Sequence, residues 1–197
     1  MARITRLDQL LTEIRACRVC AQELPLGPNP VLRARRSARI LVVGQAPGIK
    51  VHKTGIPWND ASGKRLREWM GLDESVFYDE KRIAIIPMGF CYPGTGRSGD
   101  LPPRKECAPL WHPRLLSLLP KLQLVLLIGQ YAQKHYLTDL RPTLAETVRQ
   151  REKYNPRYFP LPHPSPRNIG WLKKNSWFEQ ETVPQLRRRI RAVLHGQ

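Results

Sequence analysis

Four short apolar runs, separated by segments with helical periodicity, constrain the fold of this chain more than any other feature. The runs occupy residues 39–43, 82–87, 122–128 and 157–161. They are nearly continuous in apolar residues instead of alternating with polar ones, which is typical of strands buried on both faces of a parallel sheet. Parallel strands need crossover connections, and the intervening helical segments supply them. The sequence therefore predicts an α/β fold in which helices cover both faces of a parallel sheet.

The helical segments follow from the spacing of their apolar residues. In chain order, the helices are expected over residues 7–14, 64–70, 104–119, 131–137 and 142–151 and over most of 171–194. Ser62 is expected to cap the second of these helices. The third is expected to turn four leucines inward: Leu110, Leu115, Leu118 and Leu119. Residues 24–38, with three prolines and a basic cluster, are predicted to form an irregular connection. A length of 197 residues without internal repeats favours one domain over residues 1–197.

A large positive charge narrows the range of partners. Lys and Arg total 33 against 16 Asp and Glu, which gives a formal net charge of +17. Charge of one sign repels itself in the folded state, so a polyanion is the expected partner, and an anionic membrane surface or no partner at all are the alternatives. A membrane-spanning helix needs about 20 apolar residues, and no apolar run in this sequence approaches that length. The N-terminus lacks the apolar core of a signal peptide, so we expect a cytoplasmic protein, and nothing demands more than a monomer.

Four cysteines complete the chemical inventory: Cys17, Cys20, Cys91 and Cys107. In a reducing compartment a metal site is favoured over a disulfide framework. The first two cysteines form a close C-x-x-C pair. This pair alone is weak evidence for a metal site, but all four cysteines can join one ligand set. Four thiolates suit a [4Fe–4S] cluster, with structural zinc as the less favoured occupant and unligated cysteines as the plain alternative.

The loop over residues 44–63 is the first candidate site, because ligands of open α/β sheets bind where strands end. Its GQAPG start lets a ligand approach the backbone, but it lacks the lysine of a P-loop and the spacing of a dinucleotide-binding turn. Trp58 is equally suited to stack on a base or to anchor the core. Asp60 is a candidate carboxylate for polarising water, or an acid placed at a helix N-terminus by the helix dipole.

A second candidate site follows the fourth strand, in the segment HPSPRN at residues 163–168. Three prolines around His163 and Ser165 hold the loop stiff, which suits a side chain presented without reorganisation. A neutral imidazole there would stabilise negative charge that develops on a carbonyl oxygen. The alternative is a rigid turn with a packed histidine.

The order of these motifs resembles the uracil-DNA glycosylase superfamily. GQAPG ends the first strand, TGIPWNDASG opens a helix, GQYA follows the third strand and HPSPRN follows the last. The cysteine arrangement is similar to that of the iron–sulfur branches, families four and five. The resemblance, over residues 17–168, implies a three-layer αβα sandwich with a central four-stranded parallel sheet and a [4Fe–4S] cluster away from the catalytic atoms. It also implies that the partner is DNA with a damaged base, which such enzymes flip out before they cut its N-glycosidic bond.

The resemblance assigns roles to the residues that match family motifs. The implied catalytic residues are Asp60, His163, Gln45 and Asn59. The implied base-binding residues are Ala46, Pro47, Gly48 and Trp58. The implied DNA-binding residues are Ser165, Pro166, Arg167 and Asn168. In this scheme Asp60 orients water or stabilises the cationic sugar, His163 hydrogen-bonds the leaving base, and Arg167 fills the gap that the flipped base leaves.

The chain departs from family four at two positions. Gln45 stands where that family has Glu, so Asp60 would have to serve as the acid. Pro87 and Met88 stand where an Asn reads the uracil edge, so discrimination would pass to another residue such as Asn59. Residues 92–106 contain no histidine, which argues against the covalent capture of uracil by one branch of the superfamily.

Together these features predict a monofunctional DNA glycosylase that hydrolyses the N-glycosidic bond of uracil, or of another deaminated base, in base excision repair. The two departures motivate an alternative, a catalytically weak or inactive glycosylase-like protein that binds damaged or single-stranded DNA. A third possibility is an RNA-directed or unrelated basic α/β enzyme.

Overall fold

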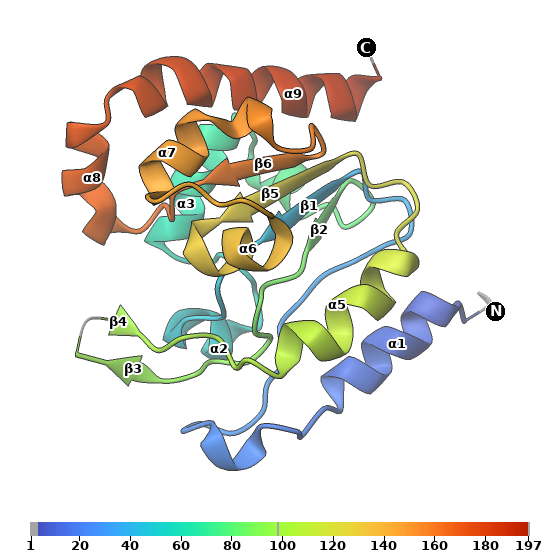
Figure 1. Cartoon of the computed structure of the whole chain (residues 1–197). Coiled ribbons are helices and arrows are strands. Elements are labelled where there is room, and N and C mark those ends of the chain that lie inside the picture. The colour runs from blue at the N-terminus through green and yellow to red at the C-terminus, as the bar shows by residue number, and fades with distance from the viewer. Residues whose placement is uncertain (1–3, 98, 197) are drawn as a thin grey trace.

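The centre of the molecule is a four-stranded, all-parallel sheet (Figure 1). The computed structural model describes residues 4–97 and 99–196. The strands are β1 (Ile40–Val43), β2 (Ile83–Ile85), β5 (Leu124–Ile128) and β6 (Tyr158–Leu161), in the order β2-β1-β5-β6. Each lies within one of the four apolar runs, so the predicted parallel sheet is confirmed.

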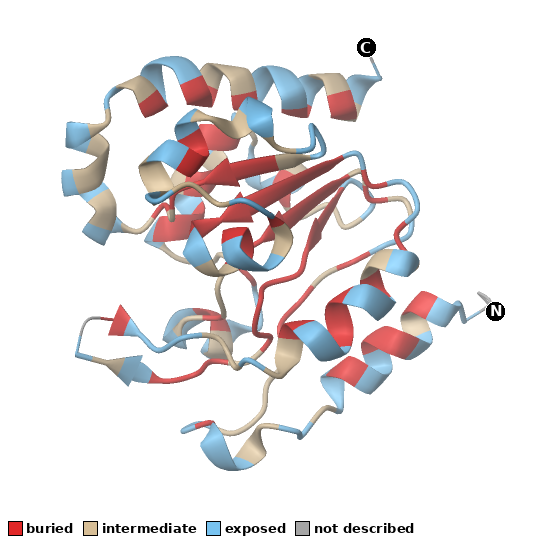
Figure 2. Ribbon diagram, in the orientation of Figure 1, coloured by how far each residue is buried: buried red, intermediate tan, exposed pale blue. Residues whose placement is uncertain are grey.

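Helices cover both faces of this sheet, because successive strand residues point to opposite sides. On one side, Leu41 and Val43 pack with α1 (Arg6–Arg15), α5 (Cys107–Ser117) and α6 (Gly129–Tyr136). On the other, Ile40 and Val42 pack with α3 (Ala61–Met70), α7 (Leu144–Arg149) and α9 (Val183–His195). The strands are buried between the two helical layers (Figure 2). The predicted three-layer αβα sandwich is confirmed.

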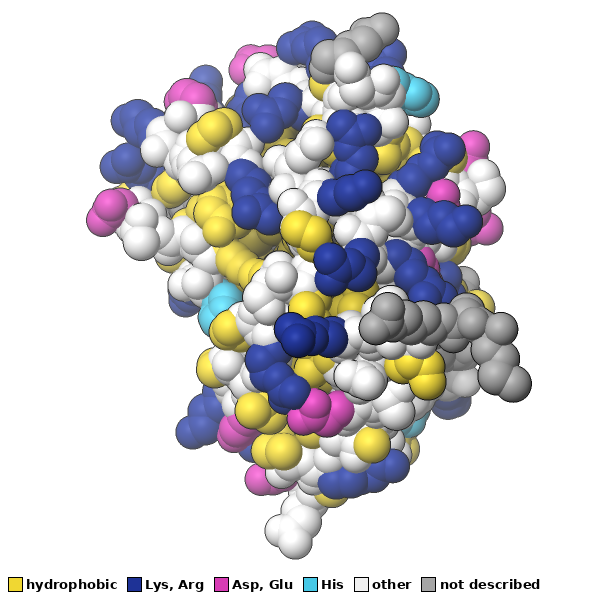
Figure 3. Space-filling view, turned by 90° about the vertical axis from the view of Figure 1, so that its right-hand side faces the viewer, with side chains coloured by type: hydrophobic (Ala, Val, Ile, Leu, Met, Phe, Trp, Pro, Cys, Tyr) yellow, Lys and Arg dark blue, Asp and Glu magenta, His cyan; other side chains and the backbone are white. Residues whose placement is uncertain are grey.

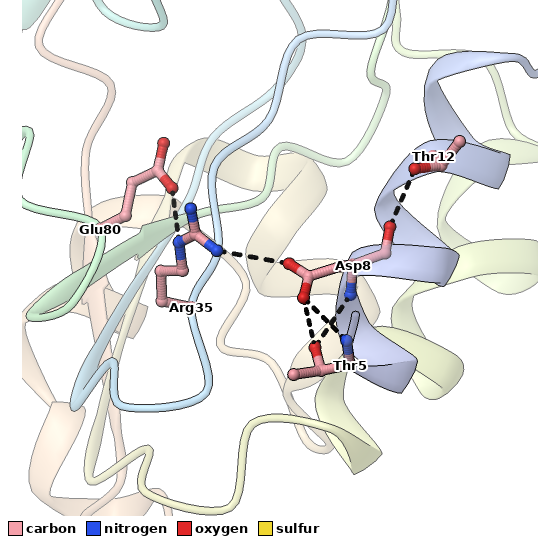
Figure 4. Close-up of polar contacts among 5 residues, drawn as sticks. All are labelled: Thr5, Asp8, Thr12, Arg35 and Glu80. Carbon is pink, nitrogen blue, oxygen red and sulfur yellow. Dashed lines mark hydrogen bonds and ion pairs between the residues drawn. The ribbon is translucent and has the colours of Figure 1, made fainter. Parts of the chain in front are cut away.

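The N-terminal helix is fixed by local and distant polar contacts (Figure 4). Thr5 and Asp8 form a capping box, in which the threonine hydroxyl accepts from the Asp8 amide and the aspartate accepts from the Thr5 amide. Arg35 pairs with Asp8 at 3.3 Å and with Glu80 at 3.4 Å. The irregular connection over residues 24–38 also covers the sheet edge, where Arg33 exchanges backbone hydrogen bonds with Ile85. This pairing protects the edge strand β2.

Several short elements are not expected from the sequence. They are α2 (Ile49–Thr54), α4 (Glu74–Phe77), the hairpin of β3 (Thr95–Gly96) and β4 (Gly99–Asp100), and 3₁₀ turns at Ala21–Glu23, Arg151–Lys153 and Pro166–Asn168. The C-terminal helical stretch is divided into α8 (Ile169–Lys174), a π-helical turn (Phe178–Thr182) and α9.

Two expectations about helix residues are wrong. Ser62 does not cap α3, because Asp60 does so and Ser62 is buried in the first turn. Leu110 does not face the core: it is 41% exposed, since α5 turns Trp111 and Leu115 toward the sheet instead.

Positive charge is spread widely over the surface. Figure 3 shows Lys and Arg side chains across the face that lies at the right of Figure 1, where the strands begin. The charge is therefore not confined to the opposite side, where the strands end. Of the helices described, none combines the length and apolarity needed to cross a membrane.

Candidate functional site

A cavity of about 310 Å³ lies where β1 and β6 end. This volume is at the lower end of the range of about 300–1,000 Å³ for small-molecule pockets. The loop after β1, the start of α3, the loop after β6 and the β3–β4 hairpin all contribute to its wall. Among its lining residues are Gly44, Gln45, Ala46, Pro47, Gly48, Trp58, Asp60, His163, Ser165, Pro166 and Arg167. The two loops singled out from the sequence therefore meet at one cavity.

Two glycines make room for Trp58, which has a positive φ of 58°. A Cβ on Gly44 would stand 2.6 Å from the indole ring, and a Cβ on Gly63 would stand 1.7 Å from the Trp58 carbonyl oxygen. The ring packs partly against the core beneath α3 and also lines the cavity. Both interpretations of Trp58, core anchor and pocket wall, are thus compatible with its position.

The position of Asp60 is likewise compatible with both of its predicted roles, an acid at a helix N-terminus and a carboxylate in the site. It is the N-cap of α3, where Oδ1 accepts a hydrogen bond of 2.7 Å from the Gly63 amide. It also lines the cavity. One carboxylate oxygen is thus engaged by the helix, while its negative charge remains at the pocket wall.

The hydrogen bonding of His163 defines its tautomer. The Ser165 amide donates to Nδ1 at 3.2 Å, so this nitrogen accepts and the proton of the neutral ring resides on Nε2. Burial lowers the pKa of His163, although the charges of Asp60 and Asp100 oppose the shift. The ring lies beside Trp58, with centroids 5.7 Å apart. The pocket therefore contains a neutral imidazole whose Nε2–H is a hydrogen-bond donor.

The loop that carries His163 is braced from both sides. Arg65 of α3 donates to the carbonyls of Pro164 and Ser165, at 3.5 and 3.3 Å. Asn168 donates from its side chain to the His163 carbonyl at 2.8 Å. These bonds, with the prolines, hold the imidazole in place before any ligand arrives.

The structure separates two predicted residues from the rest. Asn59 and Asn168 do not line the cavity, and Asn168 instead holds the His163 loop. Gln45 lines the cavity, but its Nε2 donates to the Leu101 carbonyl at 3.0 Å. That amide nitrogen is directed to the β3–β4 hairpin.

Asp100, at the end of β4, also lines the cavity, although the sequence motifs did not predict it as a site residue. The available signal was that Asp100 is the single acid in the Gly/Pro-rich stretch 92–105. Ser62 and Pro87 also line the cavity. The sequence predicts Ser62 only as a helix cap and identifies Pro87 only as a departure from the family pattern.

The four cysteines surround a second, smaller cavity. Cys17, Cys20, Cys91 and Cys107 all line it, and none of its lining residues is shared with the first cavity. Within residues 4–97 and 99–196, no three Cys, His, Asp or Glu side chains form a group close enough to hold a metal ion. Burial raises the pKa of Cys107 to about 12 and that of Cys91 to about 11. The Phe90 amide also donates to the Cys107 sulfur at 3.4 Å.

Comparison with known proteins points to one family. Residues 33–187 match the family model described as the uracil DNA glycosylase superfamily. A protein named type-4 uracil-DNA glycosylase, from Sulfurisphaera tokodaii, is 24% identical over 173 residues, which cover 81% of this chain and 74% of that protein. The matched region includes the whole sheet and both loops that form the first cavity. This chain therefore belongs to the uracil-DNA glycosylase superfamily.

Proposed function

We propose that this protein is a monofunctional DNA glycosylase that removes uracil, or another deaminated base, from DNA in base excision repair. The observation that carries the proposal is the neutral His163, held by the Ser165 amide so that Nε2–H is the donor within the cavity. When the N-glycosidic bond breaks, its electron pair leaves with the base and negative charge develops on a base carbonyl oxygen. A preorganised donor at that oxygen stabilises the charge without reorganisation.

The other cavity residues support the same chemistry. A planar base would stack on Trp58, a contact worth about 1–3 kcal/mol per base. The Asp60 carboxylate would stabilise the positive charge that develops on the sugar as the base departs. Ser165, Pro166 and Arg167 stand at the cavity on the loop after β6, where they would contact the DNA backbone and occupy the space left by the flipped base.

Excision assays test this proposal directly. Purified protein is incubated with duplexes that contain uracil, hypoxanthine or xanthine, and alkali then converts abasic sites into strand breaks. We expect breaks with the parent protein and a much lower rate with His163→Ala. Asp60→Asn is also expected to be slow, although Asn caps helices as well as Asp does. His195→Ala, in an exposed position at the end of α9, is the control.

Two outcomes would contradict the proposal. The first is the absence of breaks on all three duplexes. The second is cleavage by the His163→Ala and Asp60→Asn proteins at the parent's rate. Salt-dependent binding to DNA without any abasic product would instead favour the glycosylase-like binding protein, since each phosphate contact contributes about 0.9 to the log–log salt slope.

We also propose that Cys17, Cys20, Cys91 and Cys107 hold a [4Fe–4S] cluster. The support is that four free cysteines, distant in sequence, line one cavity next to Trp111 and Phe90. Burial disfavours the thiolates of Cys91 and Cys107, and bound iron would supply the positive charge that stabilises them. The cluster would tie the N-terminal segment to the start of α5 and serve the structure of the protein.

Colour and metal content test the cluster. We expect brown protein with a broad visible absorbance that bleaches on reduction and that is lost in Cys91→Ser. Colourless protein with one zinc per chain would show that zinc occupies the site, and protein without either metal would show that the cysteines are unligated.

A further inference from the structure

The cavity contains a second carboxylate, which lies on the β3–β4 hairpin, outside the family motifs. Asp100 is the last residue of β4 and lines the same cavity as Asp60 and His163. Its Oδ2 lies 3.2 Å from the point that a Cβ on Gly48 would occupy. The carboxylate therefore lies directly against the GQAPG loop, the loop where family four has its acid.

Hydrogen bonds hold the other oxygen of this carboxylate. The Thr95 hydroxyl donates to Asp100 Oδ1 at 3.3 Å. The same hydroxyl lies 2.5 Å from the hydroxyl of buried Tyr92, which acts as the donor of that pair when Thr95 donates to Asp100. Asp100 is exposed at the cavity rim, yet a chain of two hydrogen bonds connects it to the protein interior. Such support orients a functional side chain.

Gln45 fixes the hairpin from the opposite side. Its Nε2 donates to the carbonyl of Leu101, the residue after Asp100, at 3.0 Å. The Leu101 amide donates in turn to the Gly94 carbonyl at 2.8 Å. A glutamate at position 45 has no donor when ionised and would place its charge against the Leu101 carbonyl. The position that departs from the family pattern is thus occupied by a residue that holds the segment with Asp100.

One oxygen of each carboxylate accepts a hydrogen bond, but the bond to Asp60 is shorter and comes from a backbone amide, whereas the bond to Asp100 comes from the Thr95 hydroxyl at 3.3 Å. Asp60 Oδ1 is 2.7 Å from the Gly63 amide and is used to cap α3. We propose that Asp100 is the catalytic carboxylate that activates water and that Gln45 is the residue that positions it. This inference rests on the proposed glycosylase function and assigns the acid that its first motif lacks.

In the proposed step, the water oxygen forms a bond to C1′ of the sugar while the bond from C1′ to the base nitrogen breaks. The bonding electron pair leaves with the base, whose carbonyl oxygen accepts from His163 Nε2–H. The proton of the water passes to Asp100 Oδ2 and then to solvent, and the base anion later takes a proton from solvent. Asp60 keeps its negative charge and stabilises the sugar cation.

Single-turnover cleavage of a uracil duplex by matched variants tests this assignment. Because general base catalysis contributes about 10²–10⁴-fold, Asp100→Asn should lower the rate by that factor. Its affinity for DNA should be unchanged or tighter, because a negative charge is removed. Asp139→Asn removes the same charge from an exposed residue outside the cavity and should match the parent.

A double-mutant cycle tests the role of Gln45. Gln45→Ala should also slow cleavage, but it should add little to Asp100→Asn, because both changes disable one unit. A full additional loss in the double variant would show that Gln45 acts independently of Asp100. Thermal midpoints of all variants, and Asp100→Ala as a second substitution, separate a loss of chemistry from a loss of folding.

The assignment fails if Asp100→Asn cleaves within about threefold of the parent while Asp60→Asn is slow. In that case the glycosylase function stands and Asp60 is the acid. If the parent cleaves no substrate at all, the proposed function fails, and the assignment of Asp100 fails with it.

Discussion

Replacing His112 with Gln should remove a pH dependence from the stability of this protein. His112 lies in α5, is 1% exposed, and is close to Pro87 and Tyr136. Its Nε2 must donate to the Pro87 carbonyl at 3.0 Å, because a carbonyl only accepts, so Nδ1 accepts from the Tyr136 hydroxyl at 2.6 Å. Burial lowers the pKa of His112 to about 4. The native state therefore contains this residue as a neutral ring at neutral pH.

The two states bind protons differently below neutral pH. An unfolded histidine, with a pKa of about 6.5, is protonated at about pH 5, whereas native His112 is not. The unfolded state thus binds more protons, and stability falls as the pH falls, by about 2 kcal/mol between about pH 7 and about pH 5. Burial also lowers the pKa values of His135 and His163, which adds to the trend. Hydrogen bonds lower the pKa values of Asp8 and Glu13, so the stability that these carboxylates contribute to the native state is lost at still lower pH.

Urea unfolding at the two pH values measures this difference. His112→Gln keeps an amide donor for the Pro87 carbonyl but does not titrate, so it should lose about 2 kcal/mol less than the parent on acidification. His195→Gln, which changes an exposed histidine at the end of α9, should behave as the parent does. Equal losses in the parent and His112→Gln would refute the reasoning, because the pH dependence would then arise elsewhere.

Three further predictions concern Gly63, Gln133 and the proposed cluster. Gly63→Ala places a Cβ 1.7 Å from the Trp58 carbonyl oxygen, so it should cost at least about 1–3 kcal/mol of unfolding free energy and abolish base excision. Gly170→Ala, with nothing within 4 Å of the new Cβ, is the control and should be neutral or stabilising. Gln133→Leu removes the donor that joins the carbonyls of Leu127 and Leu161 at the ends of β5 and β6, and it should cost about 1–3 kcal/mol in urea unfolding; an unchanged midpoint would show that the two carbonyls find other partners. Removal of the proposed cluster should lower the thermal midpoint of the parent but not that of Cys91→Ser, because ligand binding stabilises only the state that binds it.

Local patterns were sufficient for the layers of the fold. The apolar runs around Val42, Ile85, Leu126 and Phe159 predict buried parallel strands, because each strand must fill space on both of its faces. The GQAPG and HPSPRN segments were placed correctly at strand ends, since motif and strand are adjacent in the chain. The cap of α3 was assigned two residues too late, because Asp60 and Ser62 are both good caps and only the backbone decides between them.

The composition of the candidate site depended on contacts that sequence spacing does not encode. Asp100 enters the cavity because a short hairpin folds back over Gly48, and Gln45 holds that hairpin across 56 positions of sequence. Asn59 is adjacent to Trp58 and Asp60, yet it is not among the residues that line the cavity. The tautomer of His163 likewise follows from one backbone amide in a stiff loop. The sequence alone determined the strands, the order of the motifs and the residue types available for chemistry, since these depend on neighbouring positions. Only the tertiary structure decided which of those side chains share a cavity, because that depends on how distant segments pack.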